Sequence, residues 1–141
     1  ALYRALLASM LLFAAGGLIG WLIGGVNMVI PAHYHGSIVG VTLALMGLTY
    51  VLLPKLGFSE PRGRIARIQP VIYAAGQLLH IGGLAVSGAM GIQRKTAGSA
   101  QGLEGLYAKI AMGVMGLGGL LAVIGGILFV IVVIRAFSQR E

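Results

Sequence analysis

Residues 107–134 read YAKIAMGVMGLGGLLAVIGGILFVIVVI, and this stretch decides the fold class. Lys109 is its only charged residue. A helix needs about 20 apolar residues to cross roughly 30 Å of hydrocarbon, and this stretch is longer than that. A strand of a membrane barrel would alternate apolar with polar residues, and no such alternation is present. The stretch therefore predicts a transmembrane helix.

Three further apolar stretches precede it, at residues 5–26, 31–53 and 70–92. Helices are expected for all of them, because a segment inside lipid must satisfy its own backbone polar groups. The first stretch is too long for a cleavable signal peptide. We therefore expect an all-α integral membrane protein, with residues 1–141 forming one unit of four helices at about 5–26, 31–53, 70–92 and 107–134.

The overall composition agrees with a membrane location. Apolar residues make up 58% of the chain and charged residues only 9%, with a mean hydropathy of +0.97. Soluble domains carry roughly 25% charged residues. The chain has 24 glycines, which are frequent where membrane helices pack closely, and it has no cysteine. Disulfides and thiolate metal sites are therefore excluded.

The net charge of +7 reflects membrane topology rather than nucleic-acid binding, because the basic residues flank apolar stretches and form no continuous patch. Seven basic residues fall on one predicted side and three on the other. The larger group predicts that both termini and the 55–69 connection lie in the cytoplasm, or in an organelle's matrix. The first group is Arg4, Lys55, Arg62, Arg64, Arg67, Arg135 and Arg140, and the second is Arg94, Lys95 and Lys109.

The segment Pro31-Ala32-His33-Tyr34-His35-Gly36 carries two histidines at the start of the second predicted helix. Residues i and i+2 of a helix point about 200° apart, so the two imidazoles would face opposite neighbours. They could not bind one metal together, but they could serve two cofactors, and imidazole is a common axial ligand of heme iron. The alternative interpretation is that both histidines are polar residues at the membrane interface and bind no cofactor.

The surrounding residues resemble subunit I of the heme-copper oxidases. That family has a glycine-rich helix, a short outer connection and a helix that opens with His-aromatic-His. Here Gly16-Gly17-Leu18-Ile19-Gly20 is followed by a short turn and by 29–35, and the third helix ends in Gly91-Ile92-Gln93-Arg94-Lys95. The last motif is similar to the family's Gly-x-Pro-Arg-Arg. The resemblance covers nearly the whole chain and implies the last four helices of a twelve-helix bundle.

The resemblance implies a role for each of four residues. His33 would be the proximal ligand of a high-spin heme, and His35 an axial ligand of a low-spin heme on the other face of the helix. Arg94 and Lys95 would pair with heme propionates. Two hemes are therefore implied, and the copper of the active site would be ligated outside this chain.

The chain departs from the family pattern at several positions, so the sequence does not determine which branch of the heme-copper oxidase superfamily it resembles. Lys95 replaces an arginine and lacks the bidentate fork of a guanidinium. Gln93 replaces a proline, and the outer connection lacks the His-Asp pair of many members. The other heme and copper ligands would lie in earlier helices of the same subunit or in a companion chain.

His80 is the remaining histidine, about 21 Å of helix below Arg94. We expect an interhelical hydrogen bond for it, with Gln77 as a possible partner. A group on a proton pathway is the functional alternative.

These expectations describe part of a heme-copper terminal oxidase that reduces dioxygen to water in an energy-transducing membrane, the plasma membrane of a bacterium or archaeon. Its partners would be the remaining helices, other oxidase subunits and lipid, but no nucleic acid. A nitric oxide reductase-type subunit and a small diheme b-type cytochrome are the alternatives that keep heme. An assembly factor or small transporter is the alternative without it.

Overall fold

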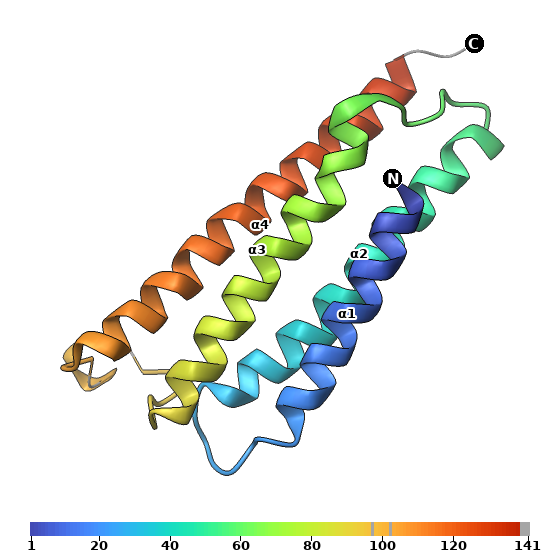
Figure 1. Ribbon diagram of the computed structural model, residues 1–141. Coiled ribbons are helices and arrows are strands. Elements are labelled where there is room, and N and C mark those ends of the chain that lie inside the picture. The colour runs from blue at the N-terminus through green and yellow to red at the C-terminus, as the bar shows by residue number, and fades with distance from the viewer. Residues whose placement is uncertain (97, 102, 139–141) are drawn as a thin grey trace.

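The computed structural model describes residues 1–96, 98–101 and 103–138, and within them the chain is a bundle of four long α-helices (Figure 1). The helices are α1 (Leu2–Gly20), α2 (Val29–Lys55), α3 (Gly63–Ala89) and α4 (Leu106–Ser138), with a short 3-10 helix, η1, at Gly98–Gln101. All four α-helices are long and apolar enough to cross a membrane. The predicted all-α, four-helix membrane fold is confirmed.

The bundle consists of two antiparallel helix pairs, α1 with α2 and α3 with α4 (Figure 1). Glycines allow the backbones within each pair to approach closely. A Cβ on Gly16 would overlap the backbone of Gly36 and Ser37 on α2, and a Cβ on Gly83 would lie 2.6 Å from the carbonyl oxygen of Ala111 on α4. Because lipid tails are as apolar as the helices, such close van der Waals packing is a main source of helix association. In contrast, α2 scarcely contacts α4.

The helix boundaries differ from the predicted ranges at two places: one where an apolar stretch continues after the helix ends, and one where a helix begins in a polar stretch. Helix α1 ends at Gly20 although apolar residues continue to Val26, because Gly24 and Gly25 follow and the chain turns there. Helix α3 begins at Gly63, seven residues before Pro70, where the prediction began it. The basic first turns of α3 are too polar to count as a membrane span, yet Ala66 and Gln69 are buried. They are therefore part of the packed bundle.

One end of the bundle carries the two histidines of α2 and the connections α1–α2 and α3–α4; we call it the histidine end. The opposite end, the termini end, carries both chain termini and the α2–α3 connection (Figure 1). At the histidine end the backbone N–H of Met28 donates a hydrogen bond to the carbonyl of Ile92 at 3.1 Å, and Asn27 pairs with Gln93 as an isolated antiparallel bridge. This loop contact joins the two helix pairs directly before α2 begins.

Candidate functional site

His33 lies in the second turn of α2 and faces α1. Its Nδ1 is 2.8 Å from the carbonyl oxygen of Gly16. A carbonyl can only accept, so Nδ1 carries the proton and donates, and Nε2 keeps its lone pair. A Cβ on Gly20 would lie 2.7 Å from the same Nδ1, so the glycine leaves room for the ring. Two glycines of the Gly16-to-Gly20 motif therefore fix both the position and the tautomer of His33.

His35 faces a different neighbour, helix α3. Its ring centroid is 5.1 Å from that of His80 and 5.5 Å from that of Tyr34. Its Nδ1 is buried, and the ring interacts with the backbone of Pro31, one turn earlier in α2. The two imidazoles of α2 thus point to separate sides of the helix, the arrangement that a spacing of i and i+2 favours.

A hollow of about 350 Å³ opens beside His35, where α2 and α4 diverge. Its volume lies within the range of small-molecule pockets, and it is open on one side. Glycines and small residues of α4 form one wall, and polar side chains of α3 form another. The lining consists of His35, Tyr73, Gln77, His80, Gly119, Ala122, Val123 and Gly126.

His80 does form an interhelical hydrogen bond, but its partner is the carbonyl oxygen of Met115 on α4, 2.9 Å from Nδ1, and not the suggested Gln77. The sequence did not predict that His80 lies beside His35, because the depth of His80 in the membrane was compared only with that of Arg94. The two helices are antiparallel, so His35 lies about 9 Å from the start of α2 and His80 about 13 Å from the end of α3. Comparing those two depths would have brought the histidines together.

Arg94 and Lys95 lie directly after the loop contact, at the histidine end. The Nε of Arg94 is buried and lacks a hydrogen-bond partner within the described part of the chain. Lys95 is exposed, and its φ of 59° lies in the left-handed region. The loop contact therefore brings two cations to the end of the bundle that carries His33 and His35.

The backbone of Lys95 gives a prediction about stability. A side chain at this φ costs about 1 kcal/mol that glycine does not incur. The Lys95→Gly protein should therefore exceed the Lys95→Ala protein in free energy of unfolding by about that amount, since both lose the same charge. Chemical denaturation of the detergent-solubilised proteins measures the difference. Equal stabilities would show that the backbone at position 95 is unstrained.

These residues fit a heme on each side of α2. A ligating histidine usually donates its second ring N–H to a carbonyl or carboxylate, and His33 does so to Gly16 while leaving Nε2 available. The ring of His35 lines a hollow, and Arg94 offers an unpaired buried donor for a carboxylate. Among the described residues, His, Cys, Asp and Glu form no group of three that could hold a metal ion by themselves.

Comparison with known proteins agrees with this fold. No protein-family model matches the chain. It is 43% identical over 136 residues to an uncharacterized protein of Rickettsia prowazekii (strain Madrid E), covering 89% of this chain and 26% of that protein. It is 35% identical over 69 residues to an uncharacterized protein of Aquifex aeolicus (strain VF5), covering 48% and 18%. The chain thus spans about a quarter, or less, of the length of these relatives.

A solved structure shares the whole arrangement of helices. It is the electron cryo-microscopy structure of a heme-copper terminal oxidase dimer, which superposes with a TM-score of 0.84 at 21% sequence identity. The match covers 99% of this chain and 27% of the oxidase chain. The chain therefore has the fold of a four-helix portion of a heme-copper terminal oxidase.

Proposed function

We propose that this chain forms part of a membrane redox enzyme of the heme-copper terminal oxidase type. In this proposal His33 is the proximal ligand of a high-spin heme, and His35 is an axial ligand of a low-spin heme. The observation that carries it is the placement of two imidazoles on different sides of one membrane helix, His33 held by a backbone carbonyl and His35 at the edge of a hollow. A polar surface role would require neither the carbonyl partner of His33 nor the hollow beside His35.

The chain's own residues would position and orient the cofactors. Gly16 holds the His33 ring through its carbonyl, so that Nε2 keeps its direction and its lone pair. The hollow beside His35 would receive one face of the low-spin heme, with Tyr73 and His80 in its wall. Arg94 and Lys95 would neutralise propionates, which are costly near hydrocarbon unless they are paired.

Heme held by His35 would supply one-electron transfer, and heme held by His33 would supply the site at which the oxidant is reduced. The second axial ligand and the distal copper would come from the remaining helices of the catalytic subunit or from a companion chain. Dioxygen is the proposed oxidant, and other oxidase subunits and membrane lipid are the proposed partners. The proposed location is the plasma membrane of a bacterium or archaeon, with both termini in the cytoplasm.

The test is the absorbance spectrum of the reduced protein, purified in mild detergent with its bound partners, before and after addition of carbon monoxide. We expect both a low-spin heme signal and a second heme whose spectrum shifts with carbon monoxide. Heme absorbance without any carbon monoxide response would instead identify a diheme electron-transfer cytochrome, because a six-coordinate iron has no free position. Absence of heme from an intact complex would refute both heme functions. Consumption of nitric oxide but not dioxygen would reassign the oxidant.

A further inference from the structure

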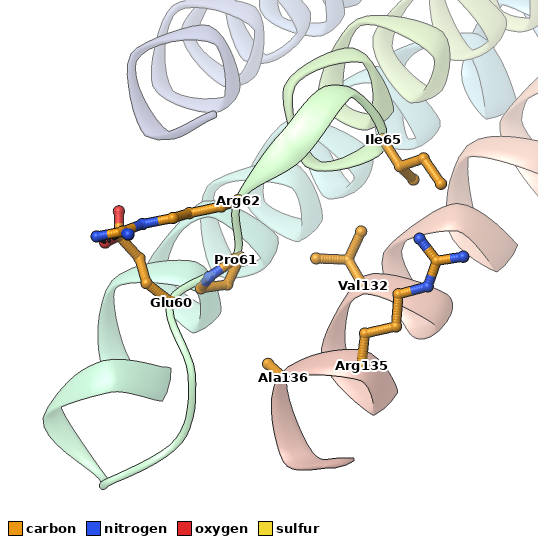
Figure 2. Close-up of a pocket in the computed structure, with 7 residues that line it drawn as sticks. All are labelled: Glu60, Pro61, Arg62, Ile65, Val132, Arg135 and Ala136. Carbon is orange, nitrogen blue, oxygen red and sulfur yellow. Dashed lines mark hydrogen bonds and ion pairs between the residues drawn. The ribbon is translucent and has the colours of Figure 1, made fainter. Parts of the chain in front are cut away.

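A second pocket, about 180 Å³ in volume, lies at the termini end, far along the bundle from the histidines (Figure 2). It is formed where the α2–α3 connection and the first turns of α3 meet the last turns of α4. Its lining residues are Glu60, Pro61, Arg62, Ile65, Val132, Arg135 and Ala136. One part is apolar and the other is charged, so the pocket is amphipathic.

The connection that covers the pocket is fixed to α4. The backbone N–H of Ser59 donates to the carbonyl of Ala136 at 3.2 Å, and the rings of Phe58 and Phe137 lie 4.5 Å apart. The apolar wall below consists of buried Val132 and Ala136 and half-buried Ile65. The pocket is therefore held open by packed structure and requires little rearrangement to accept a ligand.

The charged side chains of the pocket favour an anion. They comprise two guanidinium groups and one carboxylate, so the pocket carries a net charge of about +1. Figure 2 shows Arg135 extending from α4 past Val132 toward Ile65, while Arg62 and Glu60 lie against each other on the other side. Within the described part of the chain, Arg135 has neither a hydrogen-bond partner nor an ion-pair partner. Lys55 at the end of α2, and Arg64 and Arg67 in the first turns of α3, add to the positive field at this end of the bundle.

The position of Arg135 along α4 corresponds to the headgroup layer of a bilayer. If the hydrocarbon begins near Lys109, about 20 helical residues cross its roughly 30 Å, and it ends near Phe129. The headgroup region adds about 5–7 Å, or roughly four or five residues. The backbone of Arg135 lies about 9 Å beyond Phe129, just outside this layer, and its side chain extends back past Val132 toward Ile65, to the depth of the lipid phosphates (Figure 2).

We infer that this pocket binds the phosphate headgroup of an anionic phospholipid. The phosphate would contact Arg135, and the start of the acyl chains would lie against Ile65 and Val132, while Arg62 stays paired with Glu60 on the other side of the connection (Figure 2). The apolar wall favours a lipid over a free anion, because inorganic phosphate would leave that wall exposed. This binding site does not depend on the heme function proposed above.

The inference is tested by native mass spectrometry of the intact protein, with its bound partners, in mixed micelles. Phosphatidylglycerol is titrated against phosphatidylcholine with the same acyl chains, and inorganic phosphate is titrated separately. We expect phosphatidylglycerol to be retained preferentially. Arg135→Gln should weaken its apparent affinity about fivefold, the factor that one basic side chain contributes at an anionic surface. Glu60→Gln, which raises the pocket's charge, should strengthen it.

Arg64→Gln is the matched control, because Arg64 lies two residues from Arg62 but outside the pocket lining. Its affinity for phosphatidylglycerol should fall by less than that of Arg135→Gln, because Arg64 adds only to the surrounding field and does not contact the phosphate. An equal loss in Arg64→Gln and Arg135→Gln would overturn the inference, since diffuse surface charge would then explain the binding. Equal retention of the two lipids would overturn it as well. Competition by inorganic phosphate at the lipid's own concentration would identify a free-anion site instead.

Discussion

The His33→Gly protein should lose the heme signal that shifts with carbon monoxide and should retain the low-spin signal. Glycine removes the ring that the structure places against Gly16, and it leaves a cavity of the shape of an imidazole. Added imidazole should enter that cavity and restore part of the signal, since it replaces the ligand without its covalent link. The spectra of reduced protein, with and without carbon monoxide and imidazole, measure both effects.

Two variants separate ligation from damage to the helix. Ser37→Gly, one turn further along α2, should lower helix stability by about 0.5 kcal/mol, as the change in helix propensity at His33→Gly does, but should keep both heme signals. His35→Gly should remove the low-spin signal and should affect the signal that shifts with carbon monoxide less. If Ser37→Gly behaved like His33→Gly, or if imidazole restored nothing although the protein remained folded, His33 would not be a ligand.

The Gly16→Ala protein should be less stable by about 1–3 kcal/mol, a cost typical of overpacking. The new methyl group would overlap the backbone of Gly36 and Ser37, and backbone atoms cannot move aside as a side chain can. Separation of α1 from α2 would also move the Gly16 carbonyl away from His33. Thermal unfolding in detergent measures the first effect, and weakened heme retention measures the second.

Gly17→Ala is the control for this change, because no atom of another described helix lies within 4 Å of the position of its Cβ. Alanine is favoured over glycine inside a helix by about 0.5–1 kcal/mol, so this variant should be as stable as the parent or slightly more so. The two variants differ only in which face of α1 carries the methyl group. Equal stability of the two proteins would contradict the close contact of α1 with α2.

The sequence predicted the number and type of helices well, because hydropathy alone determines whether a segment can cross a membrane. It predicted their ends less well. Arg64 and Arg67 lie in the first turns of α3. Their charge lowers the local hydropathy, so hydropathy alone does not predict a helix there. Residues 21–26 show the opposite case: they are apolar and were predicted to be helical, but α1 ends at Gly20 because glycines follow. In both places local backbone chemistry determines where the helix begins or ends, and the pattern of apolar residues does not predict that position.

At the candidate site, periodicity placed His33 and His35 on different faces of α2 but could not name their neighbours. The bond from His33 to Gly16 depends on the register between α1 and α2, which the close approach of two glycines sets. The contact of His35 with His80 depends on the register between α2 and α3, which the loop contact sets. Neither register is encoded within a single helix, so the sequence did not reveal the hollow.

The loop contact between residues 27–28 and 92–93 also imposes an order on biosynthesis. The N–H of Met28, just ahead of α2, receives its acceptor only when Ile92 has been made. That residue emerges roughly sixty residues after the histidines, which corresponds to about 3–12 s at a synthesis rate of about 5–20 residues per second. Among the described helices, only α1 is available to pack against the histidine end of α2 during that interval. His80 and the rest of α3 therefore reach His35 seconds after His35 itself is made.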